Sequence, residues 1–155
     1  MITILSGPVQ TGKSTQLKNL VKNTSSVGGF ICTDLNGFRH LMNAHDKGIH
    51  TFEIEKDASV PCINVGRFTF ALSAFDIAGK WTKEQLNSES IRTIIIDEIG
   101  KLEMNDQGFH DLFVFVLNHI YTKHLIIVVR DFLLDDFIKK YALKDYEIKN
   151  TLDAL

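Results

Sequence analysis

The fold is decided by residues 2–21, ITILSGPVQTGKSTQLKNLV. This stretch opens with a short apolar run that is typical of a strand, and after Lys13 the residues Leu17, Leu20 and Val21 recur at helical spacing. Between them lies the pattern G-x-x-x-x-G-K-S, ending at Ser14. A glycine-bounded loop between a strand and a helix is the context in which this pattern binds phosphate.

The predicted phosphate-binding residues are Gly7, Pro8, Val9, Gln10, Thr11, Gly12, Lys13, Ser14 and Thr15. The two glycines let the backbone turn tightly, so that successive N–H groups form an anion-binding nest at the start of the following helix. We expect Lys13 to reach the β- and γ-phosphates and to act in catalysis, and the Ser14 hydroxyl to ligate Mg²⁺. Thr15, next in line, is expected to bond the α-phosphate side.

Length and composition indicate one globular domain spanning residues 1–155. The apolar fraction of 45% and the charged fraction of 23% are ordinary for such a domain. A net charge of −2 provides no basic surface for nucleic acid or an anionic membrane, so neither is expected as a partner. No apolar run approaches about 18 residues and no basic signal segment heads the chain, so we expect a cytoplasmic protein.

The remaining sequence alternates strand-like and helix-like segments. Two apolar, β-branched runs at 91–98 and 125–129 are typical of strands buried on both faces of a parallel sheet. Amphipathic spacing after Asp106, a plausible N-cap, predicts a helix to about residue 120. Further helices are predicted at 74–87 and 133–141, and further strands at 28–33 and 147–149. These segments predict an α/β fold with a mostly parallel sheet covered by helices.

Residues 49–72 do not follow this alternation of strands and helices. They contain short runs in which apolar and polar residues alternate, including Phe52, Ile54, Phe68 and Phe70. Such runs are typical of antiparallel strands, so we expect a small β-meander inserted into the domain.

Two acidic residues, Asp97 and Glu98, end the strand predicted at 91–98. In phosphate-loop folds the adjacent strand supplies an Asp that holds Mg²⁺, usually through its water, and we assign this role to Asp97. Glu98 directly after it is suited to accept a proton from an attacking water, as a general base. The pair therefore favours hydrolysis over transfer to a second substrate.

The acidic pair belongs to the stretch IDEIGKLEM, residues 96–104, which carries a family resemblance. It is similar to the signature I-D-E-I-G-K-M-E of the small P-loop nucleoside triphosphatases called thermophile nucleoside-triphosphate phosphatases, with Leu102 as the departure. Weaker similarities are GFICT at 29–33 and VGRF at 65–68. The resemblance implies a RecA-like fold and Mg²⁺-dependent hydrolysis of several nucleoside triphosphates, such as ATP and GTP, to diphosphate and phosphate. Gly100 and Lys101 fall in the signature and are candidate nucleotide contacts.

Arg130 is a third candidate for catalysis. It follows the strand predicted at 125–129 and should emerge at the sheet edge that carries the phosphate loop. A guanidinium there could stabilise charge on the γ-phosphate. The alternative is an ion pair with Asp131, Asp135 or Asp136.

Two other functions remain open. A small-molecule or nucleotide kinase shares the phosphate loop but usually surrounds its acceptor with arginines. This chain has only Arg39, Arg67, Arg92 and Arg130 and no Arg-rich lid segment. A nucleotide-dependent switch or binding module would need an exposed partner surface, for which the candidates are Phe38, Phe68, Phe70, Phe75 and Trp81. No sequence feature assigns an oligomeric state.

Overall fold

A computed structural model describes residues 1–8 and 11–152 of the chain. The elements are β1 (Ile2–Leu5), α1 (Lys13–Asn23), β2 (Val27–Leu35), β3 (Phe38–Asn43), β4 (Ile49–Thr51), β5 (Cys62–Val65), β6 (Phe68–Ala71), α2 (Leu72–Leu86), β7 (Thr93–Ile99), α3 (Lys101–Met104), α4 (His110–His119), β8 (His124–Val129), the 3₁₀ helix η1 (Asp131–Leu133), α5 (Leu134–Lys140) and β9 (Tyr146–Lys149). No helix within the described ranges is long and apolar enough to cross a bilayer.

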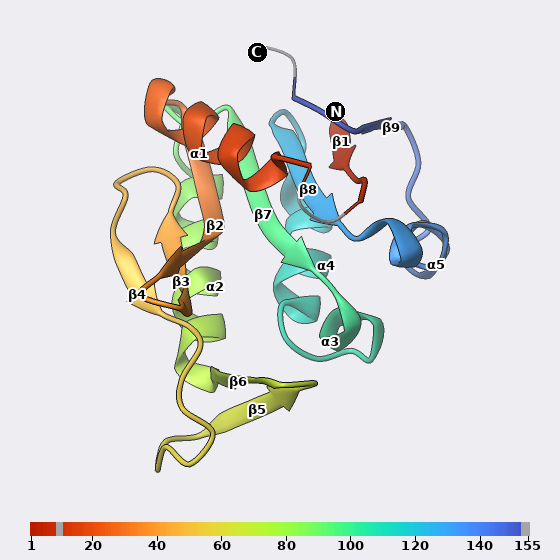
Figure 1. The fold of residues 1–155 in the computed structure, drawn as a ribbon. Helices are drawn as coiled ribbons and strands as arrows, with labels where there is room; N and C mark the ends of the chain where they lie inside the picture. The colour runs from red at the N-terminus through yellow and green to blue at the C-terminus, as the bar shows by residue number, and fades with distance from the viewer. Residues whose placement is uncertain (9–10, 153–155) are drawn as a thin grey trace.

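The main sheet has seven strands in the order β4-β3-β2-β7-β8-β1-β9. The five strands from β2 to β9 in this order run parallel, whereas β3 and β4 add an antiparallel edge next to β2. Helices cover both faces of this sheet (Figure 1). The predicted helix-covered, mostly parallel sheet is therefore confirmed.

Two apolar clusters lie on opposite faces of the sheet. On one face, Leu17 and Val21 of α1 pack against Ile95 and Ile126. On the other face, α2, α4 and α5 cover the side chains that alternate with these, such as Ile94 and Ile127. Because β7 and β8 are buried on both faces, they need apolar residues at every position, and that need explains their continuous runs in the sequence.

The strand order differs from the sequence-based expectation in one respect that matters for the site. Strand β8 lies between β1, which leads into the phosphate loop, and β7, which carries Asp97. The expectation that an adjacent strand supplies this acid is therefore wrong. The chain crosses from β1 to β2, adds β7 beside β2, and then places β8 in the gap between β7 and β1.

Only part of residues 49–72 leaves the main sheet. Strand β4 pairs with β3 and extends the main sheet, while β5 and β6 form a separate two-stranded antiparallel sheet. This hairpin is held to the preceding segment by backbone bonds, including Ile54 N–H to Thr69 O at 2.9 Å and Ala71 N–H to Phe52 O at 2.9 Å. In Figure 1 the hairpin lies at the N-terminal end of α2, across from α3.

Helix α4 begins later than the sequence predicts. Its N-cap is Phe109, and Asp106 instead adopts a positive φ of 59° in the turn before it. The reason is the short helix α3, which occupies residues 101–104 and forces the chain to turn before α4 begins.

Candidate active site

The phosphate loop connects β1 to α1, and its lysine is bound to the loop itself. Gly12 caps α1 with a φ of 81°, a left-handed conformation that favours glycine. The Lys13 ammonium donates to the carbonyl oxygens of Gly7 at 2.9 Å and Pro8 at 2.7 Å, and to Thr11 Oγ1 at 2.9 Å. Three oxygen acceptors thus hold the positive charge over the loop. Val9 and Gln10, also assigned to the loop from sequence, lie outside the described residues.

Ser14 and Thr15 occupy the first turn of α1, and both are exposed. Directly before the loop, Ser6 is buried, with 2% of its surface exposed, and its hydroxyl has no hydrogen-bond partner among the described residues. Because Ser14 is exposed, this predicted Mg²⁺ ligand is accessible, and it lies at the N-terminal end of α1, where the helix dipole favours anions.

Asp97 is held at an irregularity of β7. The register of β7 and β8 shifts between Ile96, opposite Ile127, and Ile99, opposite Val129, so that three steps along β7 match two along β8. At this point the Asp97 carboxylate accepts the backbone N–H of Cys32 at 3.0 Å. The side chain thereby continues the β2–β7 hydrogen bonding, whose last strand pair is Phe30 with Ile96.

The environment of Asp97 disfavours its negative charge. The pKa of this carboxyl is raised to about 7, chiefly by burial. The nearby Glu98 also acts to raise it, whereas the Cys32 amide and the charges of Arg39 and Lys18 act to lower it. Only 4% of Asp97 is exposed. A cation bound next to this carboxylate would compensate the buried charge, as expected for a metal ligand.

Cys32 is a neutral neighbour of this carboxylate. Its thiol donates to the Asp97 backbone carbonyl at 3.0 Å. Burial raises the pKa of the Cys32 thiol, and the adjacent acids raise it further. The thiol therefore positions the strand end and lacks the thiolate character of a nucleophile.

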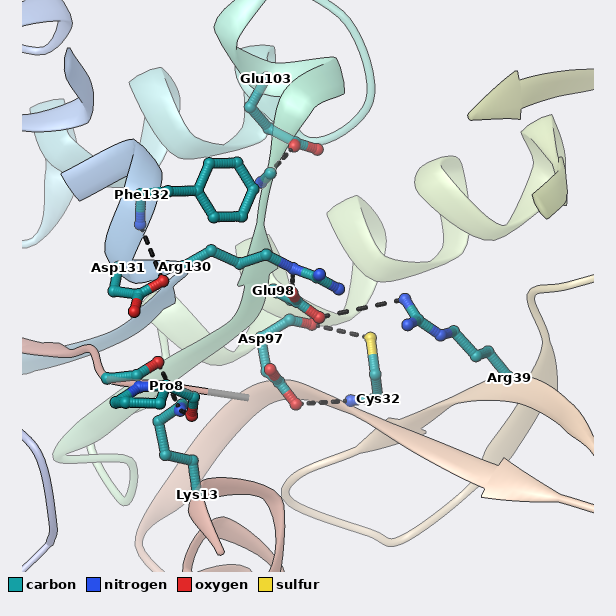
Figure 2. A network of polar contacts seen from close by, with 12 residues as sticks. Pro8, Lys13, Cys32, Arg39, Asp97, Glu98, Glu103, Arg130, Asp131 and Phe132 are labelled. Atoms are coloured by element: carbon teal, nitrogen blue, oxygen red, sulfur yellow. Dashed lines mark hydrogen bonds and ion pairs between the residues drawn. The ribbon is translucent and has the colours of Figure 1, made fainter. Parts of the chain in front are cut away.

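Glu98 faces two arginines, Arg39 of β3 and Arg130 directly after β8 (Figure 2). Its Oε1 accepts from Arg130 Nε at 2.5 Å, and its Oε2 lies 4.0 Å from Arg39 Nη1. Arg130 follows β8 as predicted, but its ion pair is with Glu98 and not with Asp131, Asp135 or Asp136. The two candidates Glu98 and Arg130 are thus in direct contact.

Glu103 is a residue of this region that the sequence analysis did not single out. It is 3% exposed, and its carboxylate accepts the backbone N–H groups of Gly100 at 2.8 Å and Phe109 at 2.9 Å. Burial raises its pKa, while these two amides lower it. A Glu at the third position of a helix, bonded to the N-cap amide, is a sequence signal that could have identified it.

Next to Glu98 lies a cavity of about 220 Å³. Gly100, Lys101 and Arg130 line it, so the structure brings these predicted residues together at one wall. None of the described phosphate-loop residues lines this cavity. Glu98 lines this cavity, whereas Asp97 lies on the side of Pro8 and Lys13 (Figure 2).

Comparisons with known proteins agree with this architecture. No curated protein sequence matches the chain. The crystal structure of THEP1 from the hyperthermophile Aquifex aeolicus matches with a TM-score of 0.72 and 20% identity, covering 97% of this chain and 90% of that one. The solution structure of a human cancer-related nucleoside triphosphatase matches with a TM-score of 0.67 and 19% identity, covering 96% and 87%.

These two structural likenesses show a shared fold. A family model described as NTPase matches residues 2–151, almost the whole chain. The resemblance found in the sequence is thereby confirmed, and this protein belongs to that NTPase family.

Proposed function

We propose that this protein hydrolyses nucleoside triphosphates, ATP and GTP among them, to the diphosphate and phosphate in a reaction that requires Mg²⁺. The observation that carries the proposal is the pair Asp97 and Glu98 near the carboxyl end of β7, at the sheet edge where the phosphate loop follows β1. Ligands of α/β proteins bind at this edge.

Lys13 and the loop would bind the triphosphate. The Lys13 ammonium exchanges its three loop acceptors for β- and γ-phosphate oxygens, so that its charge moves from neutral carbonyls to an anion. The N-terminus of α1 adds its positive end to the same group.

Ser14 and Asp97 would hold Mg²⁺. Mg²⁺ prefers oxygen ligands and is usually bound by one or two protein groups together with substrate phosphates. The described residues fit this mode, because Ser14 is exposed and Asp97 is a buried carboxylate. When bound, Mg²⁺ offsets charge on the β- and γ-phosphate oxygens.

Glu98 would take the proton of the attacking water. Its Oε1 is occupied by Arg130, which leaves Oε2 as the freer acceptor. As the water oxygen bonds to the γ-phosphorus, the bond to the β-phosphate oxygen breaks and the proton passes to Glu98. Arg130, which is paired with Glu98, would stabilise charge on the transferred group.

The test is phosphate release from Mg²⁺-ATP by purified variants. Glu98→Gln should retain nucleotide binding and lower turnover by about 10²–10⁴-fold, the range for loss of a general base. Glu89→Gln, an exposed acid without bonds to the site, is the matched control and should hydrolyse at the wild-type rate. Wild-type turnover in Glu98→Gln would refute its role as the base.

A second variant tests the loop independently. Lys13→Ala should lose several kcal/mol of transition-state stabilisation, so its turnover should fall sharply. The thermal stability of the nucleotide-free protein should not change. Lys22→Ala, on the exposed surface of the same helix, is its control. Undiminished hydrolysis by Lys13→Ala would contradict the site as a whole.

A further inference from the structure

The cavity next to Glu98 has features that hydrolysis does not use. Of the four arginines in the sequence, Arg39, Arg67 and Arg130 line this cavity, and Lys101 adds a fourth positive charge. The low number of arginines argues against a phosphoryl acceptor, yet the fold gathers most of them at one place. Their positions in one cavity therefore indicate an anion-binding site, which their low number alone does not.

The arginines are held in place by an aromatic side chain of the β5–β6 hairpin. The guanidinium carbons of Arg39 and Arg67 lie 4.5 and 4.9 Å from the centroid of the Phe68 ring. Such cation–π contacts fix a guanidinium while leaving its N–H groups able to donate to an anion. The β5–β6 hairpin thus contributes both Arg67 and the Phe68 ring to the lining of the cavity.

The positive charges of the cavity exceed the negative charges that face them. Glu98 is paired with Arg130 and lies 4.0 Å from Arg39. Glu103, the other acid of the lining, is bound to backbone amides. Within residues 1–8 and 11–152, Arg67 and Lys101 form no ion pair, and both are exposed. An anionic group is therefore the ligand that suits this wall.

Another part of the lining is apolar and aromatic. It is formed by Phe52, Phe70, Phe75 and Phe109, with Phe52 and Phe70 stacked at a centroid distance of 4.1 Å. The cavity of about 220 Å³ is small compared with ligand pockets of ~300–1,000 Å³. A small molecule with one planar ring and one anionic group matches both its size and its chemistry.

We propose that this cavity is a second-substrate site, which binds a small phosphate ester or carboxylate carrying one planar ring and lets it accept the γ-phosphoryl group in place of water. The inference rests on the proposed nucleotide site, because Glu98 and Arg130 belong to both. A hydroxyl oxygen of the acceptor bonds to the γ-phosphorus, the bond to the β-phosphate oxygen breaks, and the hydroxyl proton passes to Glu98. If an acceptor phosphate oxygen attacks, no proton need be removed. The products are the phosphorylated acceptor and a nucleoside diphosphate.

The experiment uses pyrimidine nucleoside monophosphates as probes, namely CMP, UMP and thymidine monophosphate. Calorimetry in the presence of Mg²⁺ and a non-hydrolysable ATP analogue should show saturable binding of at least one probe. Uridine, which lacks the anion, and ribose 5-phosphate, which lacks the planar ring, should each bind more weakly. With Mg²⁺-ATP, the probe should make ADP formation exceed phosphate release, and phosphorus NMR should detect the phosphorylated probe.

Matched arginine variants locate the binding. Arg67→Ala should weaken probe binding by about 10- to 100-fold, the loss expected for one charge-assisted hydrogen bond. Arg92→Ala removes the one arginine outside the cavity and should bind the probe as the wild type does. Equal affinity of Arg67→Ala and wild type would overturn the site.

Two other results would overturn the inference. One is the absence of saturable binding by all three monophosphates, and the other is binding without any phosphorylated probe. In either case hydrolysis of ATP without a probe still measures the proposed function separately. If the wild-type protein bound a probe but released no phosphate from Mg²⁺-ATP, the proposed function would instead be refuted.

Discussion

Truncating Glu103 should be among the more destabilising single changes near the site. Glu103→Ala removes a buried carboxylate that accepts two backbone N–H groups, at 2.8 and 2.9 Å. Each donor left without an acceptor costs about 1–3 kcal/mol, or about 2–6 kcal/mol for both. Burial raises the pKa of Glu103, so its ionised form is itself unfavourable in the fold, and truncation removes that cost. We therefore expect the lower part of the range, about 2–4 kcal/mol.

Urea denaturation of the nucleotide-free protein at pH 7, followed by circular dichroism, measures this loss. Glu103→Gln keeps one carbonyl acceptor and removes the charge, so it should lose less, about 1–2 kcal/mol. Glu89→Ala, on the exposed surface, is the control and should change the free energy of unfolding by at most about 0.5 kcal/mol. If Glu103→Ala were as stable as Glu89→Ala, the two amides would not depend on this carboxylate and the reasoning would be refuted.

Three further predictions follow from other parts of the molecule. Gly29→Ala should prevent folding or cost several kcal/mol in urea denaturation, because φ is +85° and a Cβ would lie 2.0 Å from a β7 carbonyl oxygen, whereas Gly66→Ala, with φ +57° and open space, should cost only about 1 kcal/mol. Burial lowers the pKa of His124, so the unfolded state binds its proton first and stability should fall as the pH drops below about 6.5 towards the folded-state pKa. The part of this slope lost in His124→Gln measures the contribution, and an unchanged slope would contradict it. Arg130→Ala should lower the turnover number more than it weakens ATP binding, with at most about 1 kcal/mol of stability lost because its pair with Glu98 is partly exposed, and equal turnover at saturating ATP would exclude a catalytic role.

Local patterns in the sequence predicted the parts of the fold that depend on neighbours along the chain. The phosphate loop needs its glycines and lysine at fixed spacing, so they are visible as a motif. Strands β7 and β8 are buried on both faces, and their continuous apolar runs follow directly from that burial. The position of Arg130 at the same sheet edge as Asp97 was predicted from its place after the 125–129 strand, whereas its pairing with Glu98 was not.

The parts that sequence reasoning missed depend on which distant segments meet. Nothing local to β8 indicates that it lies between β1 and β7, because strand order is set by how the crossovers pack. The gathering of Arg39 and Arg67 depends on a hairpin that folds back next to β3, and a count of arginines has no access to it. The start of α4 was misplaced because a buried Glu103 closes the turn before it, and sequence spacing alone favoured Asp106.

The hydrogen bond from the Cys32 backbone N–H to the Asp97 carboxylate makes one side chain matter both for stability and for the proposed chemistry. One oxygen of this carboxylate accepts a hydrogen bond that a backbone carbonyl would otherwise accept between the strands. Most substitutions at this position would therefore destabilise the sheet as well as remove the proposed metal ligand. Asparagine is the exception, because its amide oxygen can accept the same bond without carrying charge. An Asp97→Asn variant would then keep this hydrogen bond and the fold while losing the charge that we propose holds Mg²⁺.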